Sequence, residues 1–150
     1  MQNTVVLNNS VQMPKIGYRV YQIPSVMTER CVTDALHVGY RLIDTAQCYA
    51  NEKQVGNAVR KSGLARGDVF ITTKLWGGRG YADTVKSIDS SLKSLDMDYI
   101  DLLLIHEPTG DYLEIYRAME DAYRAGKLRF LSRDDPQPHR GQPNAGIPSL

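Results

Sequence analysis

The chain has 150 residues, of which 42% are hydrophobic and 23% are charged, so its composition is that of one globular domain and not of a disordered segment. Eighteen basic residues against 17 acidic ones leave a net charge of +1, which excludes a strong general attraction to nucleic acid or to an anionic membrane. No apolar run approaches ~20 residues and the first residues lack the apolar core of a signal peptide, so we expect a soluble, cytoplasmic protein. Cys31 and Cys48 lie in no metal-ligand pair and are expected to be free thiols.

Apolar periodicity and turn residues divide most of the chain into alternating strands and helices. Short aliphatic and β-branched runs predict strands, whereas apolar residues three or four positions apart, as at Val85, Ile88, Leu92 and Leu95, predict a helix. The expected elements, in chain order, are a hairpin at 4–7 and 11–13, a strand at 16–20, a helix to about 38, a strand ending at Asp44, a helix at about 51–61, a strand at 70–74, a helix at 81–95, a strand at 100–106, a helix at 113–125 and the start of a strand at 128–131.

The ends and inner faces of these helices follow from single residues. Ser25 and Thr28 are candidate caps for the first long helix, and Gly39 is expected to stop it. In the helix at 113–125, the residues expected to face the core are Ile115, Tyr116, Met119 and Tyr123.

The number of elements indicates the fold. Residues 1–131 hold four strand-plus-helix units and the start of a fifth strand, and an eight-stranded barrel takes ~250 residues. We therefore expect an α/β fold that is part of a (β/α)8 barrel, with an N-terminal hairpin and about four βα units. Residues 132–150 are rich in proline and arginine and poor in apolar residues, so we expect this tail to be disordered.

Three successive predicted strands end on ionisable residues of different kinds. These residues are Asp44, Lys74 and His106, and their spacings of 30 and 32 residues (74 − 44 and 106 − 74) fit one strand-plus-helix unit each. Tyr49 follows Asp44 by five residues, in the turn before the next helix. Because the carboxyl ends of parallel barrel strands meet at one rim, we expect all four side chains to converge there.

These four residue types suit the reduction of a carbonyl group. A phenol has an ordinary pKa near ~10, and a neighbouring ammonium lowers it by stabilising the phenolate, while a carboxylate fixes the ammonium in place. Tyr49, Lys74 and Asp44 supply these parts, and His106 can donate a hydrogen bond to an oxygen that gains negative charge. No side chain delivers hydride, so a nicotinamide or flavin is required.

Each residue taken alone has a structural interpretation. Asp44 suits a cap or an ion pair, Lys74 a surface position, and His106 a hydrogen-bonded loop. Tyr49 suits packing over the barrel mouth, and Trp76 is as typical of packing as of substrate contact. Only their coincidence at consecutive strand ends favours the catalytic interpretation.

At this point the sequence resembles the aldo/keto reductase family, most closely its bacterial 2,5-diketo-gluconate reductase type. Residues 39–56, including Asp44-Thr45-Ala46 and Val55-Gly56, fit the family's first signature, and Thr73–Trp76 and Leu104–His106 with Pro108 fit as well. The resemblance covers roughly residues 2–130 and implies a (β/α)8 barrel, NADPH as hydride donor and a small aldehyde or ketone as substrate. It implies the following residue roles: Tyr49 as acid, tuned by Asp44 and Lys74; His106 orienting the carbonyl; Val20, Tyr21 and Asp44 at the cofactor; Tyr21, Trp76 and His106 at the substrate.

The sequence also departs from the family pattern. Arg19 replaces the second glycine of a Gly-x-Gly turn beside the expected nicotinamide site, and Glu107 replaces an aromatic or amide residue. The second signature, which should follow Lys127-Leu128-Arg129, is absent, and the chain is expected to be a truncated form that lacks most of the cofactor site.

Three hypotheses follow. The first is an NADPH-dependent reductase, working alone or as a dimer of half barrels. The second is a non-catalytic fragment that persists by self-association through unpaired strand edges or by binding a partner. The third, a metal hydrolase using His106, Glu107 and Asp44, is disfavoured because Lys74 adds positive charge and no second histidine is nearby, so no metal is expected.

Overall fold

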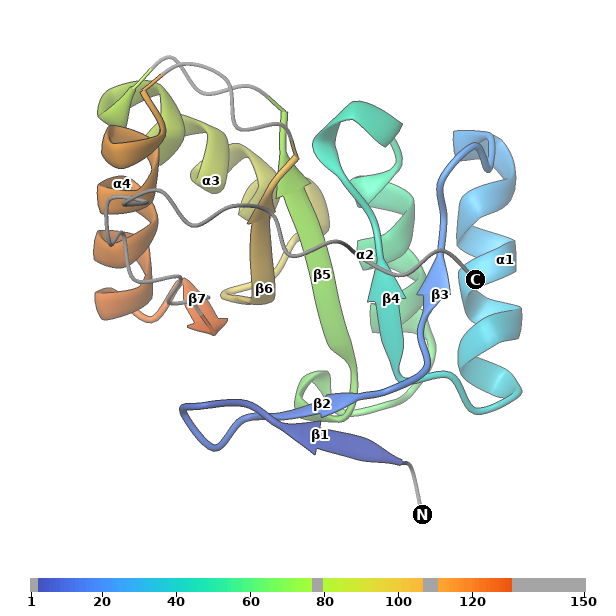
Figure 1. The fold of residues 1–150 in the computed structure, drawn as a ribbon. Coiled ribbons are helices and arrows are strands. Elements are labelled where there is room, and N and C mark those ends of the chain that lie inside the picture. The colour runs from blue at the N-terminus through green and yellow to red at the C-terminus, as the bar shows by residue number, and fades with distance from the viewer. Residues whose placement is uncertain (1–2, 77–79, 107–110, 131–150) are drawn as a thin grey trace, which may run out of the picture.

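The computed structural model describes residues 3–76, 80–106 and 111–130. Within them, a two-stranded antiparallel hairpin precedes a five-stranded parallel sheet in the order β3-β4-β5-β6-β7 (Figure 1). Successive strands along the chain are therefore neighbours in the sheet, as the βα repeat predicts. The strands are β1 (Thr4–Val6), β2 (Gln12–Pro14), β3 (Tyr18–Arg19), β4 (Leu42–Asp44), β5 (Phe70–Leu75), β6 (Ile100–Ile105) and β7 (Leu128–Phe130).

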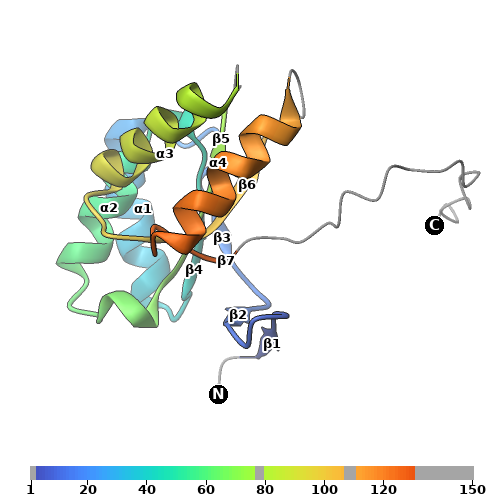
Figure 2. The ribbon, with the colours of Figure 1, turned by 90° about the vertical axis from the view of Figure 1, so that its left-hand side faces the viewer.

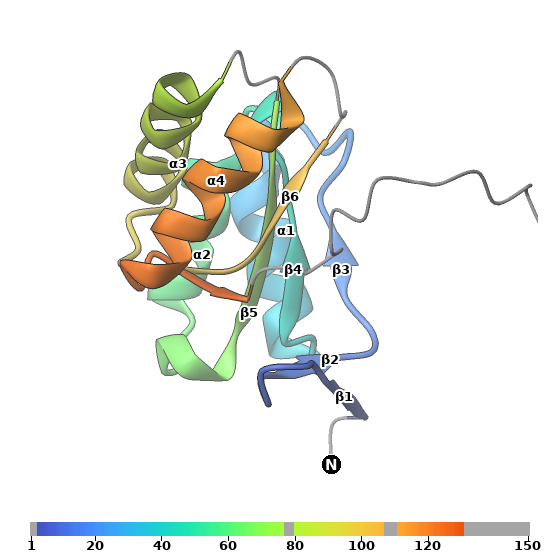
Figure 3. The ribbon, with the colours of Figure 1, turned by 60° about the vertical axis from the view of Figure 1, so that its left-hand side comes forward.

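A helix follows each of the first four sheet strands, and the helices lie together on one face of the sheet (Figures 2 and 3). The described helices are α1 (Ser25–His37), α2 (Glu52–Lys61), α3 (Tyr81–Leu95) and α4 (Tyr112–Arg124), with short 3₁₀ turns η1 (Gln47–Tyr49) and η2 (Arg66–Asp68). The predicted α/β fold, with a hairpin and four βα units before a fifth strand, is confirmed.

Two apolar clusters hold these layers together. The larger one lies between the sheet and the helices and includes Ile43, Ile71, Leu103 and Ile115, all at most 1% exposed. The smaller one lies under the hairpin, where Leu42, Phe70 and Leu102 pack against Met13 of β2 and against Leu7 and Val11 of the connection between β1 and β2. The hairpin thus lies across the end of the sheet opposite to the carboxyl ends of the strands (Figure 1).

Helices α2 and α3 approach each other closely at Gly56. A Cβ atom added at this glycine would lie 2.0 Å from the backbone oxygen of Leu95. Only a residue without a side chain allows this approach, which explains the glycine within a helix, where its backbone freedom is otherwise a disadvantage.

The helix boundaries confirm most of the predicted elements and correct some details. Gly39, with φ of 109°, follows α1 as predicted. Neither Ser25 nor Thr28 caps α1: the N-cap is Pro24, and the buried Thr28 hydroxyl instead donates to the Pro24 carbonyl oxygen at 3.0 Å. Tyr123 does not face the core, because it is 39% exposed and Ala118 and Ala122 take the buried positions of α4.

The strands differ slightly from the predicted ones. The first core strand was expected at 16–20 but is confined to β3, and β5 continues one residue beyond Lys74. The predicted strand at 128–131 is confirmed as β7, because Leu128 and Phe130 pair with Ile100 and Leu102 of β6. Among the described residues, the edges of the sheet are β3 and β7. The predicted disordered tail, 132–150, lies outside the described residues.

Candidate active site

The four residues predicted to converge do lie at one rim of the sheet. Asp44 is the last residue of β4, Lys74 is next to last in β5, and His106 comes directly after β6. Tyr49 closes the turn η1 above β4. Because β4, β5 and β6 are parallel neighbours in the sheet, their carboxyl ends meet at the same edge.

Lys74 and Asp44 form a tight ion pair. The Lys74 Nζ donates to the Asp44 Oδ1 at 2.6 Å and to the Thr45 carbonyl oxygen at 2.9 Å. The two side chains are 14% and 20% exposed, so solvent screens this pair only partly. The ammonium lies 5.3 Å from the centre of the Tyr49 ring, over its face, and is thus beside the phenol as predicted.

Aromatic rings surround the Tyr49 phenol. Its ring centre lies 6.1 Å from that of His106, with the two planes at 89°, and 5.1 Å from that of Tyr21. Trp76 packs against His106, with the two ring centres 5.1 Å apart. Tyr21 and Trp76 are 52% and 53% exposed, so both offer apolar faces to a ligand at the rim. The Cys48 Sγ lies 4.0 Å from the His106 Nδ1, and both cysteines are free, as predicted.

Arg19 makes contacts at this rim that the sequence reasoning did not foresee. Its Nη2 donates to the Tyr49 hydroxyl at 2.7 Å, and its Nε lies 3.6 Å from the Asp44 Oδ2. The hydrogen bond to Tyr49 raises the pKa of Arg19 above its ordinary value. The strand register could have indicated that Arg19 lies at the rim, because Arg19 of β3 pairs directly with Asp44 of β4.

Buried hydrogen bonds fix the turn that carries Tyr49. The Thr45 hydroxyl donates to the Asn51 Oδ1 at 2.7 Å, and the Asn51 Nδ2 donates to the Val20 carbonyl oxygen at 3.1 Å. The Val20 amide in turn donates to the Asp44 carbonyl oxygen at 3.0 Å. The Val20 side chain lies in the core, so its expected cofactor contact stays a prediction. Sequence reasoning missed Asn51, which it assigned only to a helix start.

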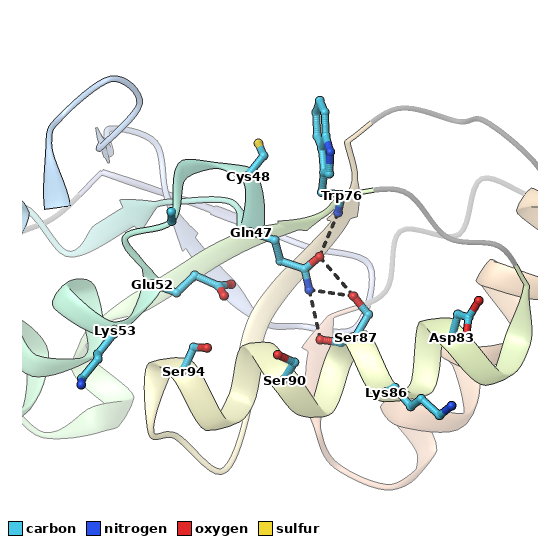
Figure 4. A pocket seen from close by; sticks show the side chains of 11 residues that line it. Gln47, Cys48, Glu52, Lys53, Trp76, Asp83, Lys86, Ser87, Ser90 and Ser94 are labelled. Carbon is cyan, nitrogen blue, oxygen red and sulfur yellow. Dashed lines mark hydrogen bonds between the residues drawn. The ribbon is translucent and has the colours of Figure 1, made fainter.

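Gln47 ties the same turn to α3. Its Nε2 donates to the Ser87 hydroxyl at 2.8 Å, and its Oε1 accepts from the Trp76 amide at 2.9 Å (Figure 4). The same Nε2 also donates to the Ser91 hydroxyl at 2.9 Å. A polar groove of ≈ 610 Å³ opens beside it, between η1, α2 and α3. Glu52 borders this groove and is 8% exposed. Burial raises the pKa of its carboxyl group, and hydrogen bonds from Thr73 and Ser91 offset part of this rise.

The described residues show neither a metal-binding cluster nor a membrane-spanning helix. No group of three histidine, cysteine or acidic residues suitable for a metal ion occurs among them, and Glu107 of the metal hypothesis lies outside them. Within the same residues, every helix is too short or too polar to cross a bilayer.

Comparisons with known proteins identify the family of this chain. The model of the aldo/keto reductase family matches residues 16–132. The glyoxal reductase of Bacillus subtilis is 41% identical over 143 residues, which are 93% of this chain and 51% of that protein. An aldo/keto reductase of Brucella melitensis has a crystal structure that superposes with a TM-score of 0.83 at 44% identity, covering 86% of this chain and 51% of that one.

One further similar structure contains a cofactor. The aldo-keto reductase of Bombyx mori, in complex with NADP, superposes with a TM-score of 0.79 at 33% identity and covers 85% of this chain and 48% of that one. The chain spans about half the length of the curated relatives it matches. With the family model matching most of the sequence and the fold matching half of these barrels, the chain belongs to the aldo/keto reductase family.

Proposed function

We propose that this chain carries the catalytic rim of an NADPH-dependent reductase of small aldehydes or ketones, with Tyr49 as general acid. The observation that carries the proposal is the convergence of Tyr49 with the Lys74–Asp44 ion pair and His106. The NADP complex of the Bombyx mori relative supports the choice of cofactor, and the glyoxal reductase relative supports a small carbonyl substrate.

Each rim residue has a role in this chemistry. The Tyr49 hydroxyl donates its proton to the carbonyl oxygen of the substrate, and the positive charge of Lys74 stabilises the phenolate that remains. The His106 imidazole donates a hydrogen bond to the same carbonyl oxygen and orients it. Asp44 holds the ammonium of Lys74, while the exposed rings of Tyr21 and Trp76 flank the substrate.

The cofactor, when bound, supplies the hydride that no side chain can deliver. Tyr21 and Asp44 fit a nicotinamide nucleotide at the rim, because Tyr21 offers an exposed ring and Asp44 keeps part of its carboxylate accessible. Val20 offers no free backbone group, since its amide and carbonyl are both hydrogen bonded within the protein.

The test is NADPH oxidation in the presence of glyoxal. The wild-type chain is expected to turn over, and Tyr49→Phe is expected to lose about 100-fold or more of the rate, because it keeps the ring and removes the proton donor. Tyr123→Phe, an exposed tyrosine on α4, serves as the matched control and keeps the wild-type rate. Equal rates for wild type and Tyr49→Phe would overturn the assignment of Tyr49.

A second proposal is a non-catalytic half barrel that associates with itself through its sheet edges. The observation in its favour is that, among the described residues, β3 pairs only with β4 and β7 pairs only with β6. Such edges present backbone groups that are ready to pair with another chain. Sedimentation should then show a dimer whose fraction rises with concentration, and a monomer at all concentrations would contradict it.

A further inference from the structure

Arg19 is the charged residue at the rim that the proposed function leaves without a role. It is the last residue of β3, and it stands beside Asp44 in the parallel register. Its side chain is 57% exposed, so nothing in the packing of the core requires a long cationic residue here.

The guanidinium of Arg19 is nevertheless held on several sides. Its Nη2 donates to the Tyr49 hydroxyl at 2.7 Å, and its Nε faces the Asp44 carboxylate at 3.6 Å. Its central carbon lies 5.0 Å from the ring centre of Tyr21 and 5.8 Å from that of Tyr49. An exposed ion pair of this length contributes little by itself, whereas the short hydrogen bond and the two rings define one orientation.

Unlike Arg19, Lys74 is not hydrogen bonded to the Tyr49 hydroxyl in the described part of the chain. Its ammonium donates to Asp44 and to the Thr45 carbonyl oxygen and lies over the face of the Tyr49 ring. In the described part of the chain, the side chain hydrogen bonded to the Tyr49 hydroxyl is that of Arg19.

We infer that Arg19 is a positioning residue that holds the hydroxyl oxygen of Tyr49 at the rim and supplies the cation in direct contact with it. The donor from Arg19 occupies one lone pair of this oxygen, so the hydroxyl hydrogen must point elsewhere. A guanidinium keeps its protons at any ordinary pH and therefore does not compete with Tyr49 as a proton source. Its charge also stabilises the oxygen after the proton has left.

The catalytic meaning of this contact rests on the proposed function, but the contact itself is testable without turnover. Nitrogen NMR of the arginine side chains distinguishes a guanidinium held by a hydrogen bond from one that rotates freely. The Arg19 signals are assigned by their loss in Arg19→Lys. In the wild type they should show hindered rotation, and in Tyr49→Phe they should show faster rotation, because the hydrogen-bond acceptor of the Nη2 group is gone.

The matched control for this experiment is Tyr21→Phe. It keeps the ring that lies under the guanidinium and removes a hydroxyl that Arg19 does not contact, so the hindered rotation should persist. Arg19 signals that are the same in wild type and in Tyr49→Phe would overturn the inference.

Measurements of kcat and KM distinguish a positioning role of Arg19 from a merely structural one. Arg19→Gln should lower kcat roughly tenfold or more with little change in KM, and Arg19→Lys should recover part of the loss, because it restores the charge. Arg30→Gln, on the exposed face of α1, should leave both constants unchanged. An unchanged kcat in Arg19→Gln would contradict the role. Absence of turnover in the wild type would instead count against the proposed function, and the NMR comparison would still decide on Arg19.

Discussion

Two carboxylates of the same sheet stand in similar charged surroundings at opposite ends of their strands. Asp101, near the start of β6, accepts from Arg66 and Arg129 at 2.8 Å each and from the Ile71 amide at 2.9 Å. Both arginines also stack on Tyr99, at 4.1 and 5.6 Å from its ring centre. Asp101 is completely buried.

Asp44, at the end of β4, also lies between two cations with aromatic rings nearby. Lys74 is 2.6 Å away and Arg19 is 3.6 Å away, but the Asp44 side chain remains 20% exposed. Charge pairing alone therefore does not reveal the role of a carboxylate. A buried and fully hydrogen-bonded carboxylate stabilises the fold. A similar carboxylate at the carboxyl end of parallel strands can act on a bound ligand, because it lies at the rim.

The largest expected effect comes from removing the buried carboxylate. Asp101→Ala leaves two arginines and the Ile71 amide without their acceptor and should lower the free energy of unfolding by about 3 kcal/mol, measured by urea unfolding. Asp98→Ala, at an exposed position close by in the sequence, is the matched control and should change little. A loss below about 1 kcal/mol for Asp101→Ala would remove the contrast between the two carboxylates.

A substitution that disturbs packing away from both carboxylates should lower stability, as Asp101→Ala does. It should not lower turnover, as a substitution at the rim would. Gly56→Ala forces α2 and α3 apart at the Leu95 carbonyl and should cost about 2 kcal/mol. Gly67→Ala has open space around the added methyl group and should be nearly neutral. Turnover per folded molecule should be unchanged in both variants, and a selective loss of turnover in Gly56→Ala would contradict this division.

A smaller effect on stability should come from Glu52, which is also a buried carboxyl group. In the described part of the chain, its side chain is hydrogen bonded to hydroxyl groups and not to cations. Burial raises its pKa, so its contribution to stability is complete below the ordinary value of 4.5 and is lost as the pH rises through the raised value. Glu52→Gln should therefore melt at a higher temperature than wild type near neutral pH and lose this advantage in acid. Glu120→Gln, a more exposed acidic residue on α4, should show no such gain. An equal advantage at both pH values would argue against a raised pKa of Glu52 in the folded protein.

The sequence was a good guide where local pattern decides the outcome. Apolar runs and their breakers placed the strand ends, and hence Asp44, Lys74 and His106, because the parallel βα repeat brings successive strand ends together. Gly39 was predicted correctly because the end of a helix is a local event.

The sequence was a poor guide where long-range packing decides. The contact of Asp101 with Arg66 joins residues 35 positions apart, and no periodicity reveals it. Tyr123 fits the helical period, but smaller alanines fill the space beneath the sheet-facing side of α4. The contact of Arg19 with Tyr49 depends on a side-chain direction at a strand edge, which the register alone only suggests.

The catalytic role of the rim carboxylate is tested by the turnover of Asp44→Asn at a matched fraction of folded protein. This variant should lose about 1 kcal/mol of stability or less, because Lys74 keeps its hydrogen bond to the Thr45 carbonyl oxygen. Its NADPH-dependent turnover of glyoxal should nevertheless fall on the order of 100-fold, since a neutral amide holds and orients the ammonium beside Tyr49 less firmly than the carboxylate does. Turnover equal to that of the wild type in a folded Asp44→Asn protein would show that this carboxylate, like Asp101, serves the fold alone.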